Sequence, residues 1–310
     1  MNTEYMRLNE ALEKPMDYDN LMQCVQILSN RFRFLSVGYL GQSILGSPIP
    51  LLSIGEGDRG ILYVGCHHGM EWITTTVLLR FLNDICVQAE SKSCAYRYSL
   101  PYLLETRTLY FIPMLNPDGV SYQIHGPNED HPLYDRLVKM NHGNKDFSTW
   151  QANARGVDLN HNYNFGFAAY KELEATAGIE EGAPTRYSGT MPESEPETGM
   201  LCNFIRFHKE IGMALTLHTQ GEVIYDGSGE YRHPKSQNIA KAFVRMSGYA
   251  YETPSDMASY GGLTDWMVGE LGRLCFTLEC GKGSNPLPIR DSLEIYMGIR
   301  ELLFSAPIYL

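Results

Sequence analysis

Residues 60–72 read GILYVGCHHGMEW, and this stretch decides the fold. Its first part, residues 60–66, is a short apolar run bounded by glycines, which is typical of a strand buried on both faces of a sheet. The chain then turns polar at His67, His68 and Glu71, and residues 71–90 follow as a long predicted helix. A buried strand, a polar turn and a helix in succession form the repeating unit of α/β domains.

The same pattern recurs along the rest of the chain. Further apolar runs predict strands at 108–114, 213–217 and 273–278, with shorter β-like runs at 34–38 and 49–54. The remaining helices are predicted at 3–14, 18–31, 193–209, 234–249 and 290–304. Strands that alternate with helices predict an α/β fold, a single-domain α/β/α sandwich with a mixed, largely buried central sheet. Residues 120–190 are rich in polar residues, Gly and Pro, and predict a loop-dominated stretch of the kind that often carries function.

The length and composition of the chain favour one large domain. The 310 residues are 44% apolar, and no linker or change in composition marks a boundary. We therefore expect one domain over 18–310, with residues 1–17 as an N-terminal extension packed on it.

Charge and cysteine usage exclude several classes of function. The net charge of −11 and the lack of a basic stripe argue against nucleic acid as a partner. No run of about 18 apolar residues predicts a membrane span, and the polar N-terminus does not resemble a secretory signal. The seven cysteines are odd in number and form no CxxC pair, so we expect buried thiols in a reducing compartment, which favours the cytoplasm.

Polar clusters follow three of the predicted strands. They are the HHGME stretch at 67–71, HTQGE at 218–222 and ECGKG at 279–283. In α/β sheets, sites form just beyond the carboxyl ends of the strands, so we expect the three clusters to converge. The His-x-x-Glu pair alone is weak evidence in a chain with nine histidines, and the convergence is what strengthens it.

These residue types suit a catalytic zinc ion. His68, Glu71 and His218 would supply two nitrogens and a carboxylate, which leaves one zinc position open for water. Hydrolysis then needs a carboxylate that takes a proton from the water and passes it to the leaving amine, and Glu279 is the candidate for this base. His67 lacks the spacing to Glu71 that His68 has, so we expect it to line the cleft or to pack.

Five segments together resemble the zinc metallocarboxypeptidase family from about residue 18 to the C-terminus. They are the His68–Glu71–Trp72 turn, NPDG at 116–119, GVDLN at 156–160, His218, and FTLE at 276–279, in the order that the family has. The resemblance implies one Zn²⁺ per chain, a peptide substrate, and the zinc ligands and base already named. It also implies that Asp158 orients the imidazole of His68 and that Asn160 contacts the substrate.

The chain departs from the family pattern in three places. The arginine that follows Asn160 in the family, and that clamps the terminal carboxylate of the substrate, is His161 here. The family's Trp-Arg pair is Trp150-Gln151, and we hypothesise that Arg155 replaces the missing arginine as a catalytic group. The family's mobile tyrosine aligns with Met257, and Tyr260 is the candidate to face the site instead.

The departures themselves resemble one branch of the family, the bacterial γ-D-glutamyl–meso-diaminopimelate peptidases. The matching segments are NARGVDLN at 153–160, HTQGE at 218–222, SYGG at 259–262 and GKGSNPLP at 281–288. This resemblance implies a murein stem peptide as substrate, with His161, Gln220 and Glu222 as candidate contacts. The alternatives are a carboxypeptidase for ordinary L-peptides, a zinc-dependent deacylase of small molecules, and a zinc-bound peptide-binding module without catalysis. His161 argues against the first of these and Glu279 against the last.

Overall fold

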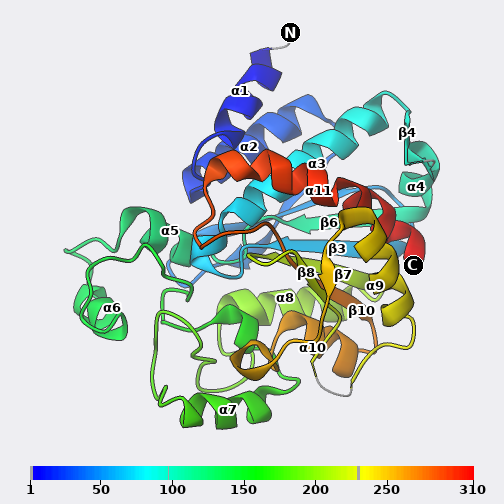
Figure 1. Ribbon diagram of the computed structural model, residues 1–310. Coiled ribbons are helices and arrows are strands. Elements are labelled where there is room, and N and C mark those ends of the chain that lie inside the picture. The colour runs from blue at the N-terminus through cyan, green and yellow to red at the C-terminus, as the bar shows by residue number, and fades with distance from the viewer. Residues whose placement is uncertain (1–2, 97, 229–230) are drawn as a thin grey trace.

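The central sheet has eight strands in the order β1-β2-β6-β3-β7-β10-β8-β9. Figure 1 shows it in the computed structural model, which describes residues 3–96, 98–228 and 231–310. The four central strands run parallel, while β1, β2 and β6 pair antiparallel at one edge and β8 runs antiparallel to β10. The predicted mixed sheet is confirmed. The strands span β1 (Ser36–Gln42), β2 (Pro48–Ile54), β3 (Arg59–Gly65), β6 (Arg107–Ile112), β7 (Ile211–His218), β8 (Val223–Tyr225), β9 (Ala250–Tyr251) and β10 (Leu274–Glu279).

Alternate side chains of the central strands enter two separate cores. Ile61 and Tyr63 of β3 belong to a large apolar cluster on one face of the sheet, whereas Leu62 and Val64 belong to a second cluster on the other. This follows from the two-residue period of a strand. Because both faces are apolar, both must be covered by helices, which gives the predicted α/β/α sandwich.

Helices cover the two faces unequally. Figure 1 shows α2, α3 and α11 on one side of the sheet and α8 and α10 on the other. Residues of α1, α9 and the three helices of the first side share the large cluster, while those of α8 and α10 share the second. The bounds are α1 (Thr3–Leu12), α2 (Tyr18–Arg31), α3 (Ile73–Glu90), α8 (Pro196–Phe207), α9 (Ser236–Ser247), α10 (Leu263–Gly269) and α11 (Ser292–Ser305).

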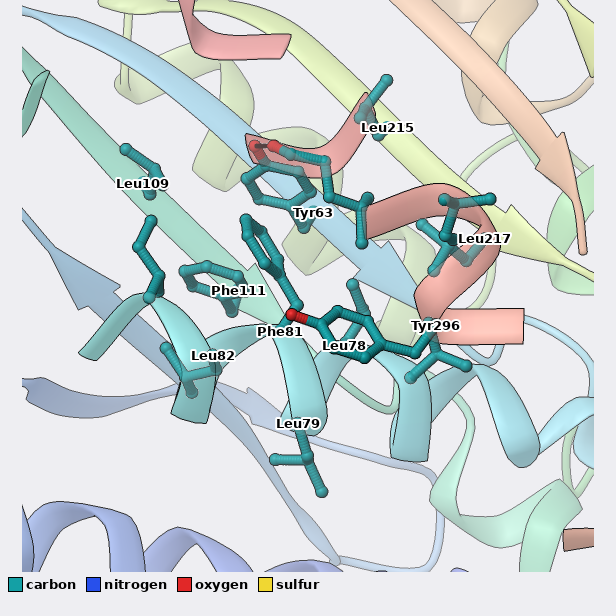
Figure 2. Packing of buried hydrophobic residues seen from close by; sticks show 14 of the residues in the cluster. Tyr63, Leu78, Leu79, Phe81, Leu82, Leu109, Phe111, Leu215, Leu217 and Tyr296 are labelled. Atoms are coloured by element: carbon teal, nitrogen blue, oxygen red, sulfur yellow. Dashed lines mark hydrogen bonds between the residues drawn. The ribbon is translucent and has the colours of Figure 1, made fainter. Parts of the chain in front are cut away.

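Aromatic rings fix the packing between the sheet and α3. Figure 2 shows Tyr63 of β3 beside Phe81 of α3 and Phe111 of β6. The ring of Tyr63 stacks on Phe111 with centroids 5.1 Å apart and meets Phe81 edge-on, also at 5.1 Å. The hydroxyl of Tyr63 donates to the carbonyl of Leu303 at 2.8 Å, so its polar end is satisfied inside the core.

The segment 120–190 contains more regular structure than its composition predicts. It holds most of α5 (Pro117–His125), together with α6 (Tyr134–Met140) and α7 (Phe167–Thr176), which the sequence analysis missed. These helices are short, and short helices gain their stability mainly from tertiary packing rather than from a local pattern. Other short elements also escaped prediction, namely the helices α4 (Leu100–Thr106) and α10, the strands β8 and β9, and the pair β4 (Cys94–Ala95) with β5 (Tyr98–Ser99). No helix among the described residues is both long enough and apolar enough to span a bilayer.

The N-terminal extension contributes to the main core. Leu8 and Leu12 of α1, with Met16 just after it, are at most 2% exposed and lie in the same cluster as α2 and α3. The extension therefore packs as an integral layer over the helices of that face.

Truncating this contact should destabilise the protein. We expect Leu8→Ala to lower the free energy of unfolding by about 2–5 kcal/mol, because it leaves a cavity in a closed core. Met6→Ala on the same helix is the matched control, since Met6 is 50% exposed and should change the value by less than about 0.5 kcal/mol. Equilibrium denaturation in guanidinium chloride measures both, and equal midpoints for the two variants would contradict the packing of α1.

Candidate metal centre

Strand pairing brings the three polar clusters together. β3, β7 and β10 are neighbours in the sheet, and their carboxyl ends are in register: Gly65 lies opposite Leu217, and His218 lies opposite Glu279. The turn after β3 carries His68 and Glu71, in and next to the short 3-10 helix η1 (Gly69–Glu71). The predicted convergence at one edge of the sheet is therefore what the fold produces.

His68, Glu71 and His218 form a group that could hold a metal ion. The Nδ1 atoms of the two histidines lie 3.3 Å apart. Glu71 places Oε1 3.1 Å from Nδ1 of His68 and Oε2 3.2 Å from Nδ1 of His218. Bonds of about 2.0–2.1 Å to a tetrahedral zinc ion would separate its ligand atoms by about 3.3 Å, so the three side chains have the spacing that zinc needs.

The carboxylate of Glu71 supports the same conclusion. Its side chain is 3% exposed, and Oε2 is buried without a hydrogen bond in the described structure. A buried carboxylate oxygen without a donor is costly, and a cation among these three side chains would remove that cost. The donor set of two imidazoles and a carboxylate, with one position left open, is that of a catalytic zinc site.

Asp158 contacts His68 at the ring nitrogen that faces away from Glu71 and His218. Its Oδ1 lies 3.0 Å from Nε2 of His68, and its two oxygens also accept the backbone N–H groups of Asn160 and Arg186. Although burial alone would raise it, the pKa of Asp158 is held well below its usual range, chiefly by His68. Asp158 therefore stays ionised and directs the Nδ1 lone pair of His68 at the metal position.

Thr216 contacts the corresponding ring nitrogen of His218, and the sequence analysis did not predict this residue. Its Oγ1 lies 3.2 Å from Nε2 of His218 and 3.3 Å from Nδ1 of His67, and Nε2 of His67 lies 2.9 Å from the hydroxyl of Tyr163. Burial lowers the pKa of His67 well below its usual value, so this ring is neutral. All three hydrogen bonds can form when His218 donates to Thr216, Thr216 donates to His67, and His67 donates to Tyr163. That arrangement leaves the Nδ1 lone pair of His218 free for a metal ion.

Glu279 ends β10 next to this group. Burial raises the pKa of its carboxyl to about 8, and the nearby Glu71 carboxylate adds to the shift. It also lines a small, solvent-open recess with Asn160, His161 and Tyr260. A carboxylate with a raised pKa can both take and release a proton near neutral pH, which suits the role predicted for it.

His161 is fixed within that recess. Its Nδ1 donates to the carbonyl of Tyr260 at 2.8 Å, and its ring stacks on Tyr170 with centroids 3.8 Å apart. The backbone of Gly261 passes so close that a Cβ atom there would lie 3.0 Å from the carbonyl oxygen of His161. Glycine at position 261 therefore lets this loop pass close to the backbone of His161.

The other predicted site residues lie outside this recess. Arg155 has a side chain 51% exposed that pairs with Glu195 at 3.7 Å, and none of its described contacts reaches the metal group. Gln220 is exposed, and Glu222 pairs with Lys282 at 2.6 Å in a separate pocket. The roles suggested for these three residues stay predictions.

The side chain of Gln151 contacts the turn that carries His68 and Glu71. Its amide nitrogen lies 3.9 Å from Sδ of Met70, the residue between the two ligands of the η1 turn. The sequence thus has an uncharged amide at the position for which the family resemblance implies an arginine.

Comparison with known proteins points to one family. A family model described as zinc carboxypeptidase matches residues 21–295. Gamma-D-glutamyl-L-diamino acid endopeptidase 1 of Lysinibacillus sphaericus is 36% identical over 294 residues, which cover 95% of this chain and 72% of that protein.

Solved structures share the fold. Carboxypeptidase A from Helicoverpa armigera superposes with a TM-score of 0.69 at 19% identity, over 96% of this chain and 75% of its own. Murein-tripeptide amidase MpaA from Escherichia coli O157 superposes with a TM-score of 0.54 at 21% identity, over 86% and 91%.

The hydroxyl of Thr216 should matter for metal affinity. We expect Thr216→Val to weaken zinc binding by about 10- to 100-fold, because Nε2 of His218 loses its acceptor. Thr216→Ser keeps the hydroxyl and should bind zinc as the natural protein does. Competition with a chromogenic chelator measures the affinities, and equal values for the valine and serine variants would contradict this role.

Proposed function

The chain belongs to the zinc carboxypeptidase family of metallopeptidases, and from this we propose that it hydrolyses the amide bond between γ-D-glutamate and a diamino acid such as meso-diaminopimelate in cell-wall peptides. We propose one zinc ion per chain, held by His68, Glu71 and His218. The support is a relative of 36% identity whose name gives this bond, together with the residues that line the recess beside Glu279.

The observation that carries the choice of substrate is the environment of His161. A carboxypeptidase for ordinary peptides needs a cation that grips the terminal carboxylate with two parallel hydrogen bonds. The Nδ1–H of His161 already donates a hydrogen bond to the carbonyl of Tyr260, and burial lowers the pKa of the ring. The described residues that line the recess include no lysine or arginine. The described lining therefore offers no arginine fork for a terminal carboxylate, which distinguishes this recess from that of a carboxypeptidase for ordinary peptides.

The proposed mechanism assigns a task to each group. A zinc ion in the site would lower the pKa of a water molecule and polarise the carbonyl of the scissile amide. Glu279 takes a proton from that water on its carboxylate and delivers it to the amide nitrogen as the amine leaves. Asp158 and Thr216 keep the two histidines in the tautomers that present Nδ1, and Asn160 can hydrogen-bond the substrate from the edge of the recess.

We further propose that the protein acts in the cytoplasm on murein stem peptides. All seven cysteines are free thiols, and six of them are buried. Thiols persist in a reducing compartment, where peptides released from the cell wall would be the substrate pool.

The proposal is tested directly with a stem tripeptide. Purified protein is incubated with L-Ala-γ-D-Glu-meso-diaminopimelate, with and without a chelator, and the products are identified by mass spectrometry. We expect free diaminopimelate and L-Ala-D-Glu, with loss of both products in chelator and recovery on adding zinc. Intact tripeptide beside chelator-sensitive cleavage of ordinary L-peptides would replace the proposal with the carboxypeptidase alternative.

Glu279→Gln separates an enzyme from a binding protein. We expect turnover to fall by at least about 100-fold, because the amide cannot accept the proton, while zinc content and tripeptide binding are retained. Glu252→Gln, at an exposed glutamate, is the matched control and should retain full turnover. Turnover that survives in Glu279→Gln would remove the residue from the mechanism, and zinc analysis and calorimetry check the loaded state of both variants.

A further inference from the structure

The loop that carries Arg186 lies against the metal centre. The N–H of Arg186 donates to Oδ2 of Asp158 at 3.0 Å, and the other oxygen of Asp158 lies 3.0 Å from Nε2 of His68. The hydroxyl of the preceding residue, Thr185, donates to the side-chain oxygen of Gln151. A single carboxylate therefore separates the backbone of Arg186 from a member of the metal group.

Arg186 is held in a backbone conformation that arginine rarely adopts. Its φ of 66° lies in the left-handed region that favours glycine. Besides the hydrogen bond to Asp158, its carbonyl accepts the hydroxyl of Tyr170 at 3.1 Å, and the ring of Tyr170 stacks on His161. Residues with a side chain that are fixed in such conformations cluster at ligand-binding and catalytic sites.

The guanidinium of Arg186 is available to a ligand. The residue is exposed, and its side chain forms no hydrogen bond or ion pair with the described residues. Arg155, the other arginine considered for the site, pairs with Glu195. Because Gln151 stands where the family pattern has an arginine, Arg186 supplies a positive charge beside the metal centre that no described carboxylate neutralises.

Arg186 and the recess beside Glu279 belong to different sides of the metal group. In the sheet, β7 lies between β3 and β10, and the recess is lined by Thr277 and Glu279 of β10. Arg186 is not among the described residues of that lining, and it contacts Asp158, which backs the ligand that follows β3. In the proposed mechanism Glu279 protonates the leaving amine, so the leaving residue occupies the recess. The acyl residue of the substrate then extends towards β3 and Arg186.

The acyl residue of a γ-D-glutamyl amide carries a charge that an ordinary peptide bond lacks. Its α-carboxylate is free, because the amide is made from the γ-carboxyl group. A guanidinium binds a carboxylate through two parallel hydrogen bonds, which fix its orientation as well as its charge. We propose that Arg186 is a specificity-determining residue that binds the free α-carboxylate of the γ-D-glutamyl residue. This inference rests on the proposed function and extends it, since it explains how a γ-linked bond is selected over an ordinary α-linked one.

Two matched substrates test this assignment. They are L-Ala-γ-D-Glu-meso-diaminopimelate and the same tripeptide with the α-carboxylate of its D-glutamyl residue converted to a carboxamide. For the natural protein we expect kcat/KM for the acid to exceed that for the carboxamide by about 10- to 100-fold, the range for hydrogen bonds between charged groups. Arg186→Gln should abolish this preference, chiefly by raising KM for the acid.

Binding without turnover gives a second readout. Calorimetry with the Glu279→Gln protein should show tighter binding of the acid than of the carboxamide, and Arg186→Gln added to that protein should remove the difference. The glutamine at 186 retains both backbone hydrogen bonds, and thermal melting with zinc analysis verifies that each variant is folded and loaded.

Two further arginines serve for comparison. Arg7→Gln removes an exposed arginine from α1, which packs on the helical layer of α2 and α3, and it should leave the preference for the acid intact. Arg155→Gln examines the other candidate. A preference lost in Arg155→Gln but kept in Arg186→Gln would transfer the role to Arg155 and overturn the assignment.

Failure of this inference and failure of the proposed function give different results. Equal kcat/KM for the acid and the carboxamide in the natural protein would overturn the role of Arg186 while leaving γ-D-glutamyl cleavage established. Cleavage of neither tripeptide, beside chelator-sensitive cleavage of ordinary L-peptides, would overturn the proposed function and the role of Arg186 with it.

Discussion

Parallel pairing in register at the carboxyl ends of β3, β7 and β10 is the constraint on which the rest of the molecule depends. It sets His218 opposite Glu279 and the turn after Gly65 beside both. A slip of one residue in β7 would turn His218 to the opposite face and bring Leu217 into its place. The two apolar cores prevent that slip, because each central strand sends alternate side chains into a different core.

This dependence explains how much of the protein could be predicted from the sequence. Buried parallel strands are apolar throughout, so polar residues at their ends stand out, and His68, His218 and Glu279 could be found in this way. Thr216 gives no such signal, since a threonine inside a strand is ordinary and its role depends on where His67 lies. The helix α7 (Phe167–Thr176) escaped for a related reason, because its stability comes from contacts that are distant along the chain.

Site residues that were predicted from their proximity to a motif in the sequence lie outside the recess, whereas residues that the fold brings together line it. Arg155 and Glu222 lie close to site motifs along the chain, yet their described partners are the buried Glu195 and the exposed Lys282. Asn160, His161 and Tyr260 come from two separate loops, and they line the recess together because α10 (Leu263–Gly269), which follows Tyr260, packs against β10. Loops between strand and helix decide which side chains reach the recess, and their paths are set by tertiary contacts.

The departures from the family pattern act together. Histidine at position 161 removes a cation from the recess, and with it the grip on a terminal carboxylate. Gln151 likewise stands where the family pattern has an arginine, so both departures remove a positive charge from the family's set of site residues.

The central claim is that His68, Glu71 and His218 form a catalytic zinc site, and anomalous X-ray diffraction at the zinc edge tests it most directly. We expect one strong anomalous peak per chain, about 2.0–2.1 Å from Nδ1 of each histidine and within bonding distance of the Glu71 carboxylate. A crystal grown with zinc that shows no peak among these side chains, or a peak bound by other residues, would contradict it.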